Sequence, residues 1–276
     1  MKHIVVLYHA DCSDGFGAAW SAWKKFKNKA DYLPVHHQEP PPPGLKNKEI
    51  YLLDFTYFGE ALEKLIRENK VTTIDHHVSA ETAVKTAPQY VFNLDHSGAA
   101  LAWKFFHPKK PTPYLIKYVE AGDLWRFTLP NSNMIRKVVD TKPFDMKVWD
   151  KMARYLEKPS YRKQFAIKGK AMIIFEEAEV KKLIAKAEIA NFENQEIWVV
   201  NSATFRSEVG GMLSKKGPHV VLIWNYYKEK IYVSLRSNGS IDVSKLAKKY
   251  GGGGHTVAAG FTMSAKDPLP WKYLTK

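Results

Sequence analysis

The sequence predicts an α/β protein with an N-terminal domain built on a parallel sheet, a helical connector and a smaller C-terminal α/β domain. Two observations lead to this prediction. Short apolar runs alternate with helical patterns in the first part of the chain, which is the order typical of a parallel sheet. Strand patterns return from Ile197 onward, after a long helical stretch. The predicted domains cover residues 1–135, 136–192 and 193–276.

Three predicted strands are continuous apolar runs, which is typical of strands that are buried on both faces. They cover residues 4–8, 50–55 and 71–74, and the second includes a carboxylate near its end. Each run is followed closely by acids or histidines. Ligands of open α/β sheets bind beyond the carboxyl ends of the strands. We therefore expect these polar side chains to meet at that edge of the sheet.

The remaining N-terminal segments show helical patterns and one stiff connection. A helix is predicted over residues 58–69, and Ser97 is a suitable N-cap for another. Residues 34–48 contain four consecutive prolines, which predict an extended surface connection. Helices over residues 148–156 and 165–190 make up the predicted connector.

Composition limits the classes of partner. The chain has 276 residues, of which 45% are hydrophobic, so a packed core is expected. The formal net charge of +14 favours anionic partners, which are nucleotides, nucleic acid or a membrane surface. A single cysteine, Cys12, excludes an internal disulfide and fits a reducing compartment. Since no apolar run approaches a membrane span, we expect a cytoplasmic protein without a membrane partner, and a homodimer is compatible with the sequence.

The loop after the first predicted strand carries metal-ligand side chains. It contains one imidazole and two carboxylates, in His9, Asp11 and Asp14. Gly15 and Gly17 permit a tight turn there. Such a ligand set is more typical of a Mn²⁺ or Mg²⁺ site than of a thiol-rich zinc site. The alternative interpretation is an Asp-rich turn that caps a helix.

Further ligand types follow later in the chain. Asp54 ends the second predicted strand, and Asp75, His76 and His77 follow the third. The alternative for this triplet is a solvated loop with two ordinary histidines. Asp123 is another acid beside a glycine, and its alternative is the C-terminal turn of a helix.

A run of four glycines, at 251–254, precedes His255. Because glycine lacks Cβ, successive backbone N–H groups in such a run can converge on an anion. Arg236 adds a guanidinium fork that is suited to phosphate. The alternative is a flexible helix cap and linker.

Taken in chain order, these motifs resemble those of the DHH phosphoesterase superfamily. That superfamily includes the RecJ-type exonucleases, the short-oligonucleotide ("nanoRNA") phosphodiesterases and the family II pyrophosphatases. The C-terminal part is similar to the DHHA1 substrate-binding domain, through residues 234–237, 242–244 and 251–261. Residues 201–202 and 207–210 fit the opening of that domain. Together the two resemblances cover most of the chain.

The resemblance implies a site for two divalent cations with Asp54 as the shared ligand. One cation would be held by His9, Asp11 and Asp54. The other would be held by Asp14, Asp54, His76 and Asp123. Mn²⁺ is favoured over Mg²⁺ because it accepts mixed imidazole and carboxylate ligands. Such cations activate water, so no Ser or Cys nucleophile is required.

The resemblance also assigns roles around the cations. Asp75 would orient a ligand histidine, and His77 would contact the scissile phosphate. The DHHA1-like domain would hold the terminal phosphate or the 3′ portion of the substrate across an active-site cleft between the domains. The residues implied for this task are Arg236, Ser237, Gly252, Gly253, Gly254 and His255.

The first motif departs from the superfamily pattern. In much of the superfamily its two acids are separated by one residue, whereas Asp11 and Asp14 are separated by Cys12 and Ser13. Asp14 before Gly15 matches the second acid. A strict alignment places Cys12 at the first acid, but sulfur is a soft ligand and a poor choice for Mn²⁺. The sequence therefore favours Asp11 as the ligand.

The function expected from the resemblance is that of a Mn²⁺-dependent phosphoesterase. It would hydrolyse phosphodiester bonds of short oligonucleotides or dinucleotides to mononucleotides. Alternatives within this class are a 3′,5′-bisphosphonucleotide phosphatase and a single-strand exonuclease, with inorganic pyrophosphatase a weaker option. An alternative of another class is a non-catalytic nucleotide- or RNA-binding module.

Overall fold

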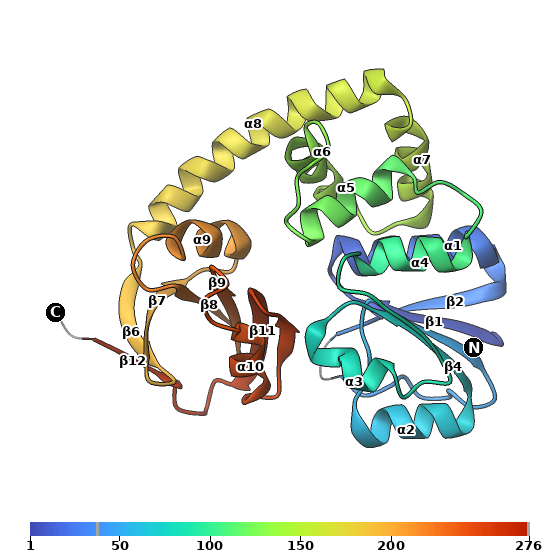
Figure 1. Cartoon of the computed structure of the whole chain (residues 1–276), viewed down its shortest axis with the longest axis horizontal. Helices are drawn as coiled ribbons and strands as arrows, with labels where there is room; N and C mark the ends of the chain where they lie inside the picture. The colour runs from blue at the N-terminus through green and yellow to red at the C-terminus, as the bar shows by residue number, and fades with distance from the viewer. Residues whose placement is uncertain (37–38, 275–276) are drawn as a thin grey trace. The chain divides into compact units, whose positions relative to one another are not determined.

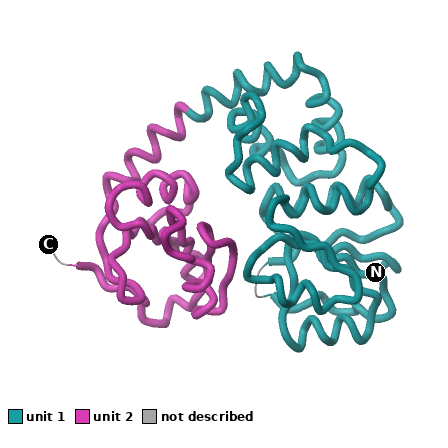
Figure 2. Tube along the Cα trace, in the orientation of Figure 1, with its two compact units in different colours: residues 1–173 teal, residues 174–276 magenta. Residues whose placement is uncertain are grey.

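The computed structural model describes residues 1–36 and 39–274, which divide into two compact units (Figure 2). The units are Met1–Ile173 and Ile174–Lys276, and each has its own sheet and hydrophobic core. Helix α8, Pro159–Ile184, runs from the first unit into the second (Figure 1). The predicted connector, 136–192, is thus divided between the units. The last two residues of the predicted C-terminal domain, 275–276, lie outside the described residues.

The first unit contains a five-stranded parallel sheet with the strand order β2-β1-β3-β4-β5. Its strands are Ile4–His9 (β1), Ala30–Val35 (β2), Glu49–Leu53 (β3), Lys70–Asp75 (β4) and Gln89–Phe92 (β5). The predicted parallel sheet is confirmed, and its three predicted strands are the central ones. The two edge strands were not predicted from the sequence. Their residues are half exposed, so neither forms a continuous apolar run.

Helices cover both faces of this sheet. Val6 and Leu53 pack with α1 (Ser13–Phe26) and α4 (Gly98–Phe106), whereas Val5 and Leu7 pack with α2 (Gly59–Glu68). This alternation follows from the two-residue period of a strand. Figure 1 shows α1 and α4 on one side of the sheet, and α2 and α3 on the other. The short helical segments are Lys27–Lys29, Val78–Ala80 and Glu81–Val84 (α3).

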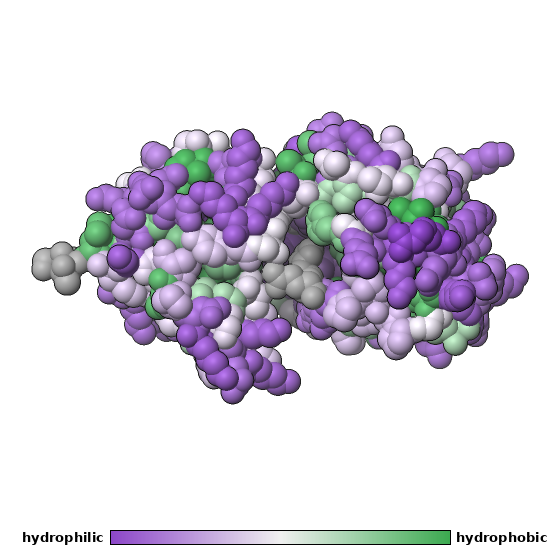
Figure 3. Space-filling model, turned by 90° about the horizontal axis from the view of Figure 1, so that it is seen from below, coloured by the Kyte–Doolittle hydropathy of each residue, from purple (hydrophilic) through white to green (hydrophobic). Residues whose placement is uncertain are grey.

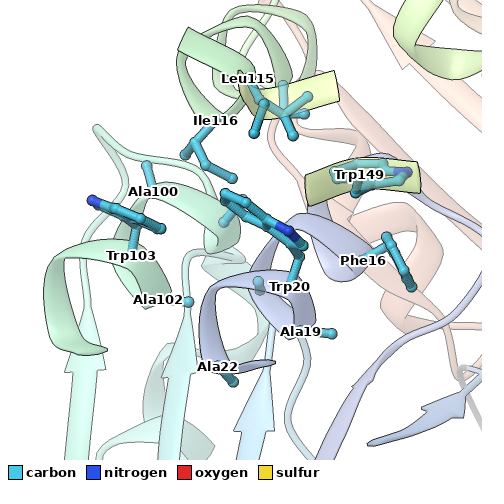
Figure 4. Packing of buried hydrophobic residues seen from close by; sticks show 14 of the residues in the cluster. Phe16, Ala19, Trp20, Ala22, Ala100, Ala102, Trp103, Leu115, Ile116 and Trp149 are labelled. Carbon is cyan, nitrogen blue, oxygen red and sulfur yellow. The ribbon is translucent and has the colours of Figure 1, made fainter. Parts of the chain in front are cut away.

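The core of the first unit is centred on aromatic residues between α1, α4 and a further helical layer (Figure 4). The rings of Trp20 and Trp103 stack at 5.6 Å, and Phe16 meets Trp149 edge-on at 4.9 Å. The further helices are Tyr114–Asp123 (α5), Ser132–Asp140 (α6) and Met146–Leu156 (α7). This layer holds the C-terminal end of α5, which carries Asp123.

The second unit contains a seven-stranded sheet with the order β10-β11-β9-β8-β7-β6-β12. Among the described strands of this second sheet, only β7 and β8 pair in parallel. The strands are Glu188–Phe192 (β6), Gln195–Asn201 (β7), Val220–Tyr227 (β8), Lys230–Ser237 (β9), Gly253–His255 (β10), Ala258–Ser264 (β11) and Trp271–Tyr273 (β12). The described residues of the second unit form two hydrophobic clusters. Helix α9 (Arg206–Leu213) packs in one of them, on one face of the sheet, and helix α10 (Val243–Lys248) packs in the other.

The helix predicted over residues 165–190 is wrong at both ends. It begins at Pro159 and ends at Ile184, and the following residues enter strand β6. Glu193 and Asn194 join β6 to β7, both with positive φ, 52° and 61°. Two successive residues in the left-handed region form the tight turn that hairpins favour. Because residues 188–192 form a strand of this hairpin, they are not part of the helix.

The surface agrees with the composition. Hydrophilic side chains cover much of the face shown in Figure 3, consistent with a net charge of +14. None of the helices in the described ranges combines the length and the apolar composition that a bilayer crossing requires.

Candidate metal and phosphate sites

The carboxyl ends of three neighbouring strands bring the first site together. His9 ends β1, Asp54 follows β3, and Asp75 ends β4 just before His76. Strand β3 lies between β1 and β4, so these ends are adjacent. The order 2-1-3-4-5 also places a topological switch point between β1 and β3, which is where open α/β sheets bind ligands.

Asp54 connects two groups of potential ligands. Its Oδ1 lies 3.1 Å from His76 Nε2, and its Oδ2 lies 3.6 Å from His9 Nδ1 and 3.5 Å from Cys12 Sγ. The residue adopts a left-handed φ of 61°, which aspartate tolerates better than most residues. One carboxylate therefore presents an oxygen to each group, as a bridging ligand must.

The group on the Oδ1 side is rich in carboxylates. His76 Nε2 lies 3.5 Å from Asp14 Oδ2 and 3.5 Å from Asp123 Oδ2. The two Asp14 oxygens accept backbone N–H bonds from Gly98 and Ala99, at 2.6 and 3.0 Å. These donors are the first residues of α4, so the helix N-terminus stabilises the buried carboxylate.

Burial and the neighbouring charges shift the pKa values of the residues in this group. Burial, followed by the neighbouring Asp54, raises the pKa of Asp14 well above its usual range, and burial also raises the pKa of Asp123. Burial by itself would raise the pKa of Asp54. Hydrogen bonds from His76 and His9 outweigh this effect and hold the pKa well below its usual range. Burial by itself would lower the pKa of His76. The neighbouring carboxylates, led by Asp54, outweigh this effect and raise the pKa to about 10.

The donor set fits divalent cations. The atoms of Asp14, His76 and Asp123 lie within 4.8 Å of one another, as do those of the group His9, Cys12 and Asp54. Clustered buried carboxylates repel one another unless a cation offsets their charge. Oxygen ligands with an imidazole suit Mn²⁺ and Mg²⁺ in the carboxylate-rich group.

Asp75 is fully buried and holds His77. Its Oδ1 accepts the backbone N–H groups of His76 and His77, at 2.7 and 3.1 Å, and lies 2.7 Å from His77 Nδ1. Its Oδ2 accepts the Thr56 hydroxyl at 2.9 Å. Burial opposes ionisation of Asp75, but His77 outweighs it and lowers the pKa. The imidazole that Asp75 orients is therefore that of His77, and Asp75 also accepts a hydrogen bond from the His76 backbone.

The structure brings Cys12, and not Asp11, to His9 and Asp54. The Asp11 side chain is 82% exposed, and its Oδ2 lies 3.7 Å from His36 Nδ1. Asp11 has a left-handed φ of 55°, so the chain turns there, and its carboxylate does not belong to the ligand group of His9 and Asp54 among the described residues. Cys12 Sγ lies 3.6 Å from His9 Nδ1 instead. The preference for Asp11 rested on ligand softness and did not account for this turn.

The second unit aligns two of the predicted substrate-binding residues. Arg236 on β9 pairs with Ala258 on β11, which pairs with His255 on β10. Side chains of directly paired residues point to the same face of a sheet. Arg236 and His255 therefore lie on one face, two strands apart.

The glycine run is ordered at its end. Gly253 and Gly254 belong to β10, so they are not a flexible linker. A Cβ on Gly252 would lie 2.1 Å from the Gly260 carbonyl oxygen, so close backbone approach requires a glycine there. The Ser237 hydroxyl donates to the Ile241 carbonyl at 2.8 Å and fixes the loop after β9.

Sequence reasoning missed Arg206, at the start of α9. Its Nη1 lies 3.4 Å from Ser234 Oγ, while Arg236 Nη2 donates to Ser207 Oγ at 3.2 Å. Burial, followed by the charge of Arg206, lowers the pKa of Arg236 to about 10. Gly210 makes room for Arg236, because a Cβ there would lie 2.4 Å from Arg236 Cγ. The available signal was that Arg206 directly precedes the recognised 207–210 motif.

These two sites define an α/β protein with a ligand cluster for divalent cations and, in its second unit, a pair of arginines, one on the sheet and one at the start of α9. Comparison with known proteins identifies the family. The DHHA1 domain family matches residues 195–270. The uncharacterized protein R106 of Acanthamoeba polyphaga mimivirus is 31% identical over 296 aligned residues, which cover 97% of this chain and 69% of that protein. The chain belongs to the DHH/DHHA1 superfamily, whose members are phosphoesterases that use divalent metals.

Two other matches agree with this assignment. Oligoribonuclease NrnB of Bacillus subtilis (strain 168) is 38% identical over 69 residues, which are 25% of this chain and 17% of that protein. The solved DHH domain of PF0399, a member of a family of ribosomal proteins, matches with a TM-score of 0.58. That match is 12% identical and covers 99% of this chain and 83% of the other, so it supports the fold alone.

Proposed function

We propose that this chain is a Mn²⁺-dependent phosphodiesterase that hydrolyses short oligonucleotides or dinucleotides to mononucleotides. The superfamily supplies the coarser activity, that of a phosphoesterase on nucleotides or polyphosphate. The observation that carries the proposal is Asp54, whose two oxygens face two separate groups of ligand atoms. A shared carboxylate is the expected feature of a two-cation phosphoesterase site.

The residues of the first site would have separate roles in hydrolysis. Asp14, His76 and Asp123 would hold one cation, His9 another, and Asp54 both. When bound, such cations lower the pKa of an attacking water and neutralise charge on the phosphate. Asp75 holds the His77 ring through Nδ1, and the pKa of His77 is raised because Asp75 outweighs the effect of burial. His77 is thus prepared to donate a hydrogen bond to a phosphate oxygen.

The second unit would bind the part of the substrate that does not react. Arg206 and Arg236 are close enough for one to lower the pKa of the other, and an anion between them would relieve that repulsion. Guanidinium forks match phosphate oxygens. A short substrate with a terminal phosphate fits this arrangement, and the oligoribonuclease among the relatives supports RNA.

The direct test is hydrolysis of a labelled RNA dinucleotide with Mn²⁺, comparing wild type with Asp54→Asn. We expect the variant to lose more than about 100-fold in rate, because the loss of a bridging ligand exceeds that of an outer partner. The exposed Glu63→Gln is the matched control for loss of a carboxylate and should remain fully active. A longer single strand and a 3′,5′-bisphosphonucleotide, tested in parallel, separate the alternatives. Wild type that binds the dinucleotide without cleaving it would favour the non-catalytic binding module.

A further inference from the structure

Cys12 places sulfur among the ligands of the first cation group. Its Sγ lies 3.6 Å from His9 Nδ1 and 3.5 Å from Asp54 Oδ2, and these atoms form a group compact enough to hold one ion. Asp11, the other candidate, is 82% exposed on its side chain. The three donors of this group are therefore an imidazole, a sulfur and a carboxylate.

The turn around Cys12 presents its sulfur to a cation. Cys12 is the N-cap of α1, a helix of 14 residues, and its Sγ accepts the Gly15 backbone N–H at 3.1 Å. A Cβ on Gly15 would lie 2.1 Å from the His9 carbonyl oxygen, so the close approach of this turn to His9 requires a glycine.

Donor softness separates the two groups. Thiolate with imidazole selects Zn²⁺ and its neighbours Co²⁺ and Fe²⁺, and it is a poor set for Mn²⁺ or Mg²⁺. The group Asp14, His76 and Asp123 has two carboxylates and no sulfur, which suits the harder Mn²⁺. The same bridging Asp54 can serve both, since carboxylate oxygens bind either class.

We propose that His9, Cys12 and Asp54 form a thiolate-containing site for a cation of the Zn²⁺ class, so that this protein holds two different metals. The proposal rests on the metal-dependent function proposed above and specifies which metal occupies each group. It replaces the expectation of two identical Mn²⁺ ions.

Cobalt spectroscopy tests the site without relying on activity. Co²⁺ is titrated into the full chain after removal of bound metals, and the near-ultraviolet thiolate-to-cobalt charge-transfer band is recorded. Cys12 is the only cysteine in the sequence, so any such band reports this residue. We expect the band in wild type and in Asp11→Ala. Cys12→Ser should lose the band and bind the first Co²⁺ more than about tenfold more weakly. Cys12→Asp should also lose the band and should shift competition toward Mn²⁺.

The outcomes separate this inference from the proposed function. The thiolate site is overturned if wild type binds Co²⁺ without the band. It is also overturned if the Asp11→Ala variant no longer binds the first Co²⁺, even if the dinucleotide is cleaved. A band in wild type without hydrolysis of any phosphoester supports the site and refutes the enzyme. Far-ultraviolet circular dichroism of each variant checks that it is folded, and Cys12→Asp provides a second reading if Cys12→Ser fails to fold.

Discussion

At the scale of single residues, the first site depends on buried groups that hold others in place. Asp75 is the clearest case, because it accepts three donors from the His76–His77 segment and one from Thr56. None of these contacts makes Asp75 a ligand in the proposed arrangement. Its contribution is the position and charge of His77.

Substitution of Asp75 by Asn should therefore reduce hydrolysis and preserve metal content. We expect a loss of about 10–100-fold in kcat, typical of a group that orients an active-site histidine. The measurements are steady-state kinetics and metal analysis of the purified variant. Loss of a cation together with the activity would show that Asp75 is itself a ligand.

His107 gives a prediction about pH that is independent of the metal site. Its ring is buried, with Nε2 3.0 Å from the Ser21 carbonyl oxygen, and burial lowers its pKa below the ordinary value of 6.5. Below pH 6.5 the unfolded chain takes up a proton at His107 that the folded chain does not, so the free energy of unfolding falls as pH falls. In His107→Gln this contribution is absent.

Denaturant unfolding at several pH values between 5 and 8 measures this difference, with the range chosen around the ordinary histidine pKa of about 6.5. The stability of wild type should decline more steeply toward low pH than that of His107→Gln. Parallel profiles would show that the pKa of His107 is the same in the folded and unfolded states.

The sequence predicts single residues well when their motif has its usual spacing. Asp14, Asp54, His76 and Asp123 were all proposed from order and residue type, and the structure brings them together. Cys12 and Arg206 were not proposed. One depends on a left-handed turn at Asp11, and the other on a helix that faces a neighbouring strand. Neither the turn nor the helix–strand contact is encoded in local pattern.

At the scale of elements, the first site depends on how closely α4 approaches the end of β3. A Cβ on Gly98 would lie 2.5 Å from Asp54 Oδ1, while the Gly98 backbone N–H holds Asp14. Gly98→Ala should displace the bridging carboxylate. We expect about a 100-fold loss of activity, since a shift of about 1 Å at a reacting centre can have that effect.

A second helical glycine supplies the control for Gly98→Ala. Gly211 in α9 has no atom within 4 Å of an added Cβ, so Gly211→Ala should leave hydrolysis unchanged. It should raise the free energy of unfolding by about 0.5–1 kcal/mol through helix propensity. Kinetics and thermal melts of both variants measure these effects. Full activity in Gly98→Ala would mean that α4 yields easily and does not position Asp54.

Elements were predictable where burial was complete. β1, β3 and β4 are buried on both faces, so each appears as an apolar run. β2, β5 and β6 are partly exposed or short. Their pattern of apolar and polar residues therefore did not distinguish them from loops and helices. The end of α8 was misplaced because the hairpin at Glu193 and Asn194 depends on two left-handed residues that carry no glycine signal.

At the scale of the whole molecule, two units with separate cores should respond separately to metal. The proposed ligands all lie within Met1–Ile173, so Mn²⁺ binding stabilises that unit directly. At a free Mn²⁺ concentration of about 100 times Kd, linkage adds about 2.7 kcal/mol. For a unit of this size, that corresponds to a rise in Tm of roughly 5–10 °C.

Calorimetry of the full chain should therefore resolve a transition that moves with Mn²⁺ and one that does not. In Asp54→Asn the first transition should stay at its metal-free Tm, whereas Glu63→Gln should behave like wild type. The independence follows from the cores, since the buried clusters around Trp20 and around Phe192 draw on different elements. If both transitions move together with Mn²⁺, the units unfold as one, and helix α8 transmits stability between them rather than only joining them.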